Sequence, residues 1–459
     1  MRLDGFGLTV DDVVEVARGG AHVELAPAAL TRMAAARDVV DRYLADGLPA
    51  YGLTTGLGAG VVNSVPADAL AEFSRNTVLG RANSVGPPLP TEVVRAAMLV
   101  RANGLAHGGS GARPELAQAL VALLERRVHP VVPSIGSTGV ADICVLAHVG
   151  LVLIGAGEAE LHGELLPGGS ALTAAGLEPL ELAPKDGLAT ISSNAVSVAW
   201  TALALADGRA ALDAAQAAAA LSFEGFRANL SPIDERVVAA RPAPGQAACA
   251  AALRELLAGG SLAASAGRRV QDPLSFRCAS QVHGSLAVAL GFLAAALEPE
   301  LNGAADNPLV LVEEGEIVST GNFHVGALAL AADAVALALA HVAQMTAARV
   351  ARLLSAQLTG LPQNLAPPGS TGAGMAPLLK VSDALAAEIT HGAAPATLVS
   401  LSGTDAIEDA TTSAPLAAAR LAALLDRLRL LTALELVVAA QAVDLAEVEA
   451  LGARTRVLH

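Results

Sequence analysis

Residues that could move a proton gather in a few glycine-rich stretches of an otherwise aliphatic chain. The clearest stretch opens on Tyr51 and continues as YGLTTGLGAG through residue 60. The chain has only two tyrosines, so one at the start of such a loop is a candidate acid or base. A phenol is ordinarily protonated at neutral pH, and a Tyr base therefore needs a neighbouring cation. The alternative interpretation is a packing Tyr whose hydroxyl is hydrogen bonded.

Three other irregular regions carry polar residues between apolar segments. They are residues 130–142, residues 301–308 with 321–324, and residues 360–374. Their Gly and Pro residues interrupt the helical pattern. The His residues show no metal-ligand spacing such as H-E-x-x-H, so no metal site is predicted. The sequence thus indicates a rigid scaffold that presents its chemistry on loops.

The segments between these loops are predicted to be helices. Apolar residues recur at helical spacing through residues 196–222 and 325–354, and they cover most faces of both segments. β-branched residues other than Val are sparse, whereas Ala and Leu dominate. We therefore predict an all-α fold in which buried helices form a bundle.

Composition limits the partners that this chain is expected to bind. The net charge is −15, and no basic stripe with interleaved aromatic residues occurs, so nucleic acid is not an expected partner. The longest apolar run, residues 143–157, is too short to cross a membrane, and no membrane association is expected. Three scattered cysteines and an N-terminus without an apolar signal core favour a cytoplasmic protein.

Several motifs of the chain resemble, in order, those of the aromatic amino acid ammonia-lyases and aminomutases, such as histidine and phenylalanine ammonia-lyase. Residues 270–281 read VQDPLSFRCASQ, similar to the family signature VQDPYSLRCxPQ. Residues 101–111 read RANGLAHGGSG, and residues 51–58 are similar to the family's YGV-T-G-G loop. The further matches are Asp306 to Leu309, Gly321 to His324, Ser355 to Pro362 and Glu408-Asp409. Because these motifs cover nearly the whole chain, it is identified as a member of this family.

The resemblance implies an architecture and an assembly. It implies a long central helical bundle with a loop-borne active site, built as a homotetramer whose pockets are shared between subunits. We expect an N-terminal helical region over residues 1–190 that holds the Tyr51 loop, and a region over residues 191–459 that holds the long helices and a shortened C-terminal part.

The main departure from the family lies at the tripeptide that forms its electrophile. The family cyclises Ala-Ser-Gly to a methylidene-imidazolone (MIO), which needs a hydroxyl on the middle residue and a flexible residue after it. Here residues 136–148 read GSTGVADICVLAH, so Gly139-Val140-Ala141-Asp142 stands at that place, one residue shorter. An Ala side chain cannot dehydrate. We therefore expect no MIO and no other cofactor, unless Ser137-Thr138-Gly139 cyclises instead.

The resemblance also assigns roles to individual residues. Tyr51 matches the family's base, Arg277 the residue that clamps the substrate carboxylate, and Glu408 a second proton-transfer candidate. Arg81 stands where a His or a ring-selecting residue is usual, and we expect its charge to act on Tyr51. The residues expected to line the substrate site are Gln271, Phe323 and Asn322, which match the family, and Ser192 and Leu274, which replace an Asn and a Tyr.

Three functions fit these residues. The favoured one is an MIO-less enzyme of specialised metabolism that carries out elimination, isomerisation or cyclisation of a carboxylate-bearing small molecule, with Tyr51, Arg81 and Glu408 as catalytic groups. The first alternative is a non-catalytic homologue that binds a small molecule or joins an active lyase as a partner subunit. The second is a true ammonia-lyase whose MIO forms from Ser137-Thr138-Gly139.

Overall fold

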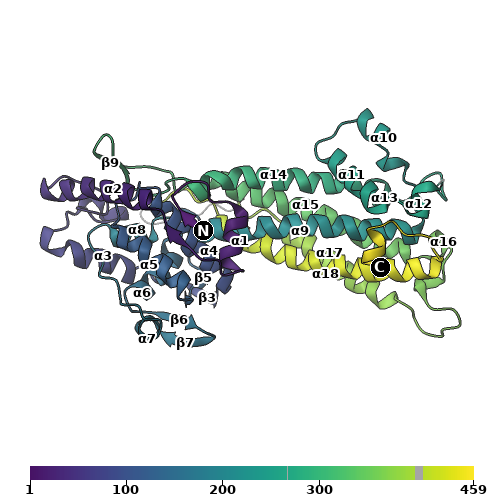
Figure 1. The fold of residues 1–459 in the computed structure, drawn as a ribbon, viewed down its shortest axis with the longest axis horizontal. Helices are drawn as coiled ribbons and strands as arrows, with labels where there is room; N and C mark the ends of the chain where they lie inside the picture. Colours follow the sequence, from purple (N-terminus) through teal and green to yellow (C-terminus); the bar gives the residue numbers. More distant parts are fainter. Residues whose placement is uncertain (266, 399–406) are drawn as a thin grey trace. The chain divides into compact units, whose positions relative to one another are not determined.

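A computed structural model describes residues 1–265, 267–398 and 407–459 (Figure 1). It confirms the all-α prediction, since its strands have only two to four residues each. The chain forms two compact units. Unit 1 comprises residues 1–206, 294–330 and 396–419, and unit 2 comprises residues 207–293, 331–395 and 420–459.

These units differ from the expected division at residue 190 because four long helices contribute residues to both. They are α9 (Ala195–Phe226), α14 (Ala279–Asn302), α15 (Gly326–Leu353) and α18 (Ala414–Ala446). The predicted helices over 196–222 and 325–354 are thereby confirmed as α9 and α15. A chain that passes between units within its helices cannot be divided into two sequential halves.

Unit 1 is built from short helices that precede or follow glycine-rich turns. They are α1 (Val10–Ala17), α2 (Pro27–Ala45), α3 (Leu70–Leu79), α4 (Thr91–Ala106), α5 (Pro114–Glu125), α6 (Ile143–Leu153), α7 (Gly168–Ala174) and α8 (Asp186–Ile191). Helix α1 shows how local sequence starts such a helix. The Thr9 side chain accepts the Asp12 N–H and the Asp12 carboxylate accepts the Thr9 N–H, which is a capping box.

Helices α3, α6 and α8 pack against one another and carry the site residues at their ends. Gly150 of α6 lies against Val78 of α3 and Thr190 of α8, where a larger residue would collide. The Ser74 hydroxyl of α3 accepts the Gly187 N–H of α8 at 2.8 Å. Because these helices are fixed together, the residues that follow α3 and α8 and the residues at the start of α6 are held in one region.

The strands are short and pair neighbouring loop segments, and all of them lie in unit 1. Strand β1 (Arg2–Leu3) pairs with β2 (Glu24–Leu25) in parallel, and the other pairs are antiparallel. Those are β3 (Val85–Pro88) with β5 (Pro133–Ile135), β4 (Val128–Pro130) with β6 (Glu158–Leu161), β6 with β7 (Glu164–Pro167), and β8 (Leu309–Leu311) with β9 (Glu316–Val318). The β3–β5 pair matters most, because it joins the segment after α3 to the loop before α6 (Figure 1).

Unit 2 buries its own aliphatic core among the long helices. Its further helices are α10 (Glu235–Ala240), α11 (Gln246–Leu257), α12 (Ser261–Ala264), α13 (Leu274–Arg277), α16 (Ala356–Thr359), α17 (Ala376–Gly392) and α19 (Thr455–Leu458). Phe223 and Phe226 of α9 pack against Phe276 of α13, with the Phe226 and Phe276 rings stacked 4.1 Å apart. This aromatic contact fixes α13, which ends at the predicted substrate residue Arg277.

Three helical stretches are long and apolar enough to cross a membrane by length and composition alone: 186–226, 279–302 and 326–353. The most apolar windows of the first and third stretches are 94% and 67% buried inside the protein, whereas that of the second is 39% buried. Protein atoms therefore already cover most of the surface of stretches 186–226 and 326–353, whereas residues 279–302 leave the largest apolar share exposed.

Candidate active site

Three side chains predicted from the sequence and one further side chain, Cys144, meet in unit 1. They are Tyr51 in the glycine-rich loop, Arg81 after α3, Cys144 in the first turn of α6, and Glu408 before α18; we call them the Tyr51–Arg81 cluster. Burial lowers the pKa of the Arg81 guanidinium, while the negative charges that Tyr51, Cys144 and Glu408 can carry raise it. These three groups therefore lie close enough to Arg81 to interact with it electrostatically, as expected for Tyr51 and Arg81.

The Tyr51 loop is held by its own backbone and by α8. The hydroxyl oxygen of Tyr51 accepts the Gly58 N–H at 2.9 Å. Gly52 has a φ of 64° and lies against the Leu188 and Leu57 side chains, which leave no room for a Cβ atom. These contacts fix the position of the Tyr51 hydroxyl within its loop.

Cys144 does not have the environment of a nucleophile. Burial raises the pKa of its thiol, and Glu408 raises it further, whereas Arg81 lowers it. The thiol is accordingly protonated at neutral pH, and a thiolate is the reactive form of cysteine. Cys144 therefore fills space beside Arg81 and is not assigned a chemical step.

The loop at residues 136–142 is fixed from several sides. The Asn194 side chain accepts the Ala141 N–H at 3.1 Å and donates to the Phe323 carbonyl at 2.6 Å. The Thr412 hydroxyl donates to the Gly139 carbonyl at 2.7 Å. Val140 forms an isolated antiparallel bridge with His324. The loop therefore has a defined shape although it lacks the family's tripeptide.

Asp142 closes this loop with a fully buried carboxylate. It accepts the Ser197 N–H and the Ser197 hydroxyl at 2.8 and 3.0 Å, and the Ser137 hydroxyl at 2.8 Å. Burial raises the pKa of Asp142, and these hydrogen bonds lower it. The Gly139 N–H points back to the Ser137 hydroxyl at 3.1 Å. The hydroxyl nearest to the former tripeptide is thus occupied within the loop.

The other predicted substrate residues of unit 1 also have protein partners. Ser192 is buried at the end of α8, and its hydroxyl lies 3.4 Å from both the carbonyl oxygen and the backbone nitrogen of Asn307. The Asn322 side chain is exposed and donates to the Ala304 carbonyl at 3.2 Å. Phe323 is half-buried, and its carbonyl accepts the Asn194 amide. Ser192 and Asn322 therefore brace the 304–308 loop.

A buried ion pair beneath α8 fixes the same loop. Arg101 donates to Asp306 at 2.7 Å through one terminal nitrogen and to the Ala189 carbonyl at 2.7 Å through Nε. Lys185 donates to the Pro308 carbonyl at 3.1 Å, and burial lowers the pKa of Lys185 to about 8. Arg101 and Asp306 stand in motifs that match the family but had no role assigned from the sequence, and sequence reasoning missed Lys185 and Asn194. The only local signal for Asn194 was the polar run Ser192-Ser193-Asn194 directly before an apolar helix.

The predicted carboxylate clamp belongs to unit 2. Arg277 is half-buried at the end of α13 and donates to the Gln271 side chain at 3.1 Å. Leu274 is 61% exposed, and Gln271 is exposed. The structure therefore brings Arg277, Gln271 and Leu274 together on one short segment.

Comparison with known proteins agrees with these motifs. A sequence model described as "Aromatic amino acid lyase" matches residues 8–459. The chain is 43% identical to histidine ammonia-lyase from Anaeromyxobacter sp. (strain K), over 96% of this chain and 90% of that protein. The chain belongs to the aromatic amino acid lyase family.

Solved structures of this family have the same fold. The crystal structure of the ergothioneine-degrading enzyme ergothionase from Treponema denticola is 32% identical, with a TM-score of 0.95 over 99% of this chain and 92% of that chain. Tyrosine aminomutase from Streptomyces globisporus is 30% identical, with a TM-score of 0.94 over 100% of this chain and 91% of that chain. Lyase-type and aminomutase proteins thus share the arrangement that positions these loops.

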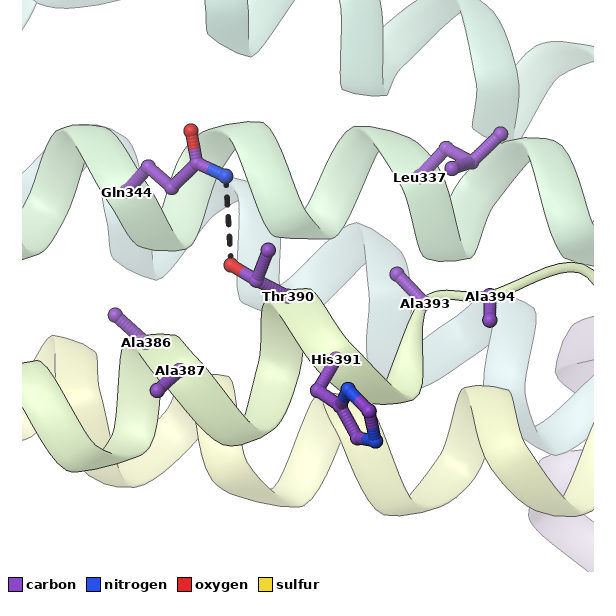
Figure 2. A pocket seen from close by; sticks show the side chains of 8 residues that line it. All are labelled: Leu337, Gln344, Ala386, Ala387, Thr390, His391, Ala393 and Ala394. Atoms are coloured by element: carbon purple, nitrogen blue, oxygen red, sulfur yellow. Dashed lines mark hydrogen bonds between the residues drawn. The ribbon is translucent and has the colours of Figure 1, made fainter.

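A separate groove of about 630 Å³ lies between α15 and α17 in unit 2 of this lyase-family chain. It is lined by Leu337, Gln344, Ala386, Ala387, Thr390, His391, Ala393 and Ala394. Figure 2 shows that its one drawn polar contact joins Gln344 to Thr390, at 3.4 Å. None of the predicted site residues lines this groove, so we do not assign the reaction to it. Among the described residues, no group of three or more His, Cys, Asp or Glu could hold a metal ion.

Proposed function

We propose that this protein is an MIO-less enzyme that eliminates a leaving group from a carboxylate-bearing small molecule. The observation that carries the proposal is the combination of two features of unit 1. Tyr51, Arg81 and Glu408 lie in one electrostatic cluster, while Gly139-Val140-Ala141-Asp142 has no hydroxyl that could become a methylidene group. The chain thus retains acid–base groups, whereas Gly139 to Asp142 cannot form the family's electrophile.

Each residue has a definite task in this elimination. Tyr51 removes a proton from the β-carbon of the substrate and later returns a proton to solvent. Arg81 supplies positive charge beside the phenol. The resemblance assigns the substrate carboxylate to Arg277 with Gln271, in a pocket shared between subunits, because a guanidinium matches a carboxylate with two parallel hydrogen bonds. Glu408 is the second proposed proton-transfer group, which exchanges protons with Tyr51 or with the leaving group.

Without the family's electrophile, the enzyme can expel only a good leaving group. An unactivated amine departs poorly, so we propose a substrate whose nitrogen is already quaternary and leaves as a neutral tertiary amine. The β C–H bond breaks, a C=C bond forms, and the amine departs with the electron pair of the C–N bond. The similarity to ergothionase supports testing ergothioneine and other trimethylammonium acids first.

The Ser137-Thr138-Gly139 route is less well supported. Cyclisation would require the Gly139 nitrogen to attack the Ser137 carbonyl carbon, whereas the Gly139 N–H donates to the Ser137 hydroxyl. That hydroxyl also donates to the buried carboxylate of Asp142. The intact mass of the purified protein separates the two routes. We expect the unmodified mass; a deficit of two waters would restore the MIO-dependent alternative.

Turnover tests the elimination itself. We expect release of trimethylamine from a trimethylammonium acid, and little release of ammonia from histidine, phenylalanine or tyrosine. Tyr51→Phe should lower turnover by about 10²-fold or more, the usual contribution of a positioned acid or base. Tyr43→Phe is the matched control, because Tyr43 is the only other tyrosine and its hydroxyl accepts the Ile317 N–H. Loss of turnover in both variants, or in neither, contradicts the assignment, and binding without turnover by any compound favours the non-catalytic homologue.

We also propose a cytoplasmic homotetramer. Exposed apolar side chains on the long helices support an assembly, for example Val288 and Phe292 on α14 and Leu430 and Val437 on α18. A surface of this kind is covered by other subunits in a helical assembly. Light scattering of the purified protein should give four times the chain mass of 45.7 kDa. A monomeric mass at micromolar concentration would contradict the tetramer.

A further inference from the structure

Three arginines of unit 2 meet at the end of α9: Arg227, Arg268 and Arg269, which we call the Arg227 cluster. Arg227 directly follows the last residue of α9, and the other two stand between α12 and α13. Arg227 donates to the Thr359 carbonyl at 2.5 Å, and Arg268 donates to the same oxygen. The Arg269 guanidinium lies over the Phe226 ring, 4.6 Å from its centroid. Three positive charges from distant parts of the chain are thus held in one place.

The Arg227 cluster carries more positive charge than its neighbours neutralise. In the described part of the chain, the only carboxylate that forms an ion pair with the cluster belongs to Asp272, whose Oδ1 lies 3.6 Å from Nη1 of Arg269. Its Oδ2 also accepts the Asn229 N–H at 2.5 Å. The shared Thr359 carbonyl carries only a partial charge. Two full positive charges therefore remain without a counter-ion, in a chain whose net charge is −15.

The cluster also contains buried donors that are not used. Nε of Arg227 and Nη1 of Arg269 are shielded from solvent, and neither has a hydrogen-bond acceptor among the residues that the structure describes. Burial lowers the pKa of the Arg227 guanidinium, and the charges of Arg268 and Arg269 lower it further. Buried donors without an acceptor, beside like charges, are unfavourable unless an anion completes their hydrogen bonds.

An arginine that joins helices in the same unit has different surroundings. Arg349 is fully buried, and the two carboxylate oxygens of Glu435 accept its N–H groups at 2.5 and 2.9 Å. The Thr346 hydroxyl and the Ser275 carbonyl accept further N–H groups of Arg349. A structural arginine of this unit is thus neutralised by the protein itself. The Arg227 cluster lacks that neutralisation, which favours an anion from outside the chain.

We propose that the Arg227 cluster binds the phosphate group of inorganic phosphate or of a phosphorylated small molecule. A phosphate dianion matches the two positive charges that lack a counter-ion, and guanidinium groups bind phosphate oxygens with paired hydrogen bonds. Arg268 is exposed, whereas Arg227 and Arg269 are half-buried, so an anion can enter from solvent on the Arg268 side. None of the three residues has a task in the proposed elimination, and the site is therefore additional to it.

Calorimetric titration of the full-length protein with inorganic phosphate tests the proposal. It is done at about pH 8, where phosphate is mainly dianionic, at constant ionic strength, with the monoanion acetate for comparison. We expect phosphate to bind about tenfold or more tightly than acetate. Arg227→Gln and Arg268→Gln should each weaken phosphate binding about tenfold or more, and Arg268→Lys should keep part of the affinity. Arg241→Gln, at the exposed end of α10, is the matched control and should keep all of it.

A further variant separates this site from the proposed carboxylate clamp. Arg277→Gln should bind phosphate as wild type does. Loss of phosphate binding in Arg277→Gln but not in Arg227→Gln would place the anion at the clamp and overturn the proposal. Equal affinity for phosphate and acetate, or no binding of phosphate, also overturns it.

Titration with glycerol 3-phosphate distinguishes the two sources of the phosphate group. Tighter binding than that of inorganic phosphate assigns the site to a phosphorylated small molecule, and weaker or equal binding assigns it to the free ion; both results support a phosphate site. Circular dichroism confirms that each variant is folded. If Arg227→Gln does not fold, the exposed Arg268 decides, and wild-type phosphate affinity in Arg268→Gln contradicts the proposal.

Discussion

The two units use buried polar groups in different ways. In unit 1, Asn194 and Thr412 donate or accept single hydrogen bonds with the backbone of the loop at 136–142. In unit 2, Arg349 forms a bidentate pair with Glu435, and both side chains are fully buried. The Ser222 hydroxyl donates to the same carboxylate at 2.8 Å. The Asn194 and Thr412 contacts in unit 1 therefore fix the shape of one loop, whereas the Arg349–Glu435 pair in unit 2 joins helices α15 and α18.

This difference predicts different consequences of mutation. Breaking a contact to a loop backbone should change one loop and the chemistry that it carries. Breaking the Arg349–Glu435 pair leaves a buried charge in an apolar bundle and should weaken the whole unit. The Ser275 carbonyl also accepts from Arg349 at 3.3 Å, so the pair reaches the segment that ends at Arg277.

The largest expected effect is therefore the loss of one partner of the buried pair. Arg349→Met leaves the Glu435 carboxylate without its cation, and we expect it to lower the free energy of unfolding by about 3–5 kcal/mol. Urea denaturation followed by circular dichroism measures the change. Adding Glu435→Leu should recover a large part of the loss, because the second charge is then removed as well.

An exposed pair in the same unit provides the control. Arg427 contacts Glu388 at 2.5 Å, but their side chains are 41% and 60% exposed. Arg427→Met should therefore change the free energy of unfolding by less than about 1 kcal/mol. Equal losses for Arg349→Met and Arg427→Met would show that burial does not distinguish the two pairs.

The second effect concerns the loop side of the comparison. Asn194→Ala removes the hydrogen bonds to Ala141 and Phe323 and leaves a buried N–H unpaired. We expect a loss of about 2 kcal/mol in the free energy of unfolding. We also expect turnover to fall, by a larger fraction than stability does, because the loop beside the Tyr51–Arg81 cluster loses its hydrogen bonds. Asn83→Ala is the control, since Asn83 is exposed and its side chain donates to the Gly80 carbonyl. Unchanged turnover in Asn194→Ala would disconnect this loop from the reaction.

The third effect is a pH dependence of the free energy of unfolding, to which one buried histidine in each unit contributes. Burial lowers the pKa of His283 in unit 2 to about 3, with the charge of Arg349 as a second cause. Burial and then the charge of Arg95 lower the pKa of His129 in unit 1 to about 4. The unfolded chain, with a His pKa of about 6.5, binds the extra protons, so stability falls as pH decreases below that value. Each His contributes a slope of up to about 1.4 kcal/mol per pH unit between its two pKa values.

Variants isolate this slope from groups that titrate in the opposite sense. Burial raises the pKa of Glu300 to about 7, so its folded form binds a proton that the unfolded form releases. The slope of the wild-type unfolding free energy against pH therefore contains opposite contributions from the histidines and from Glu300. The difference in slope between wild type and a His variant contains only the contribution of that histidine. His283→Leu and His129→Leu should each reduce the slope of the unfolding free energy against pH, measured between pH 5 and pH 6, by the amount that corresponds to about one bound proton. A slope equal to that of wild type in His283→Leu would show that His283 is protonated in the folded protein.

Sequence patterns predicted the features that depend on neighbours in the chain. Helical periodicity located α9 and α15, and the resemblance placed Tyr51 near Arg81. The division into units was not predicted, because residue 190 marks a change in local pattern while α9 continues from one unit into the other. Periodicity reports which residues are helical and not where a helix changes its packing partners.

Contacts between distant residues escaped the sequence for a related reason. Arg349 and Glu435 are 86 residues apart, and each stands in a long apolar helix where a lone charge looks exposed. Only the register of α15 against α18 makes them a pair. The Ser192 hydroxyl likewise lies 3.4 Å from the Asn307 carbonyl oxygen, 115 residues along the chain, because the end of α8 packs on the 304–308 loop. Such assignments depend on tertiary geometry that spacing does not encode.

The smallest effect tests the shape of the loop at 136–142 directly. Ala141 has a φ of 63°, a left-handed conformation that costs a residue with a Cβ atom about 1 kcal/mol. Ala141→Gly should therefore raise the free energy of unfolding by up to about 1 kcal/mol, measured by thermal or urea denaturation. Ala147→Gly makes the same chemical change inside α6, where Ala147 is fully buried, and should lower stability by about 1 kcal/mol or more. Opposite signs support the left-handed turn at Ala141, and a loss in both variants would mean that the loop that replaces the family's tripeptide is not folded in this way.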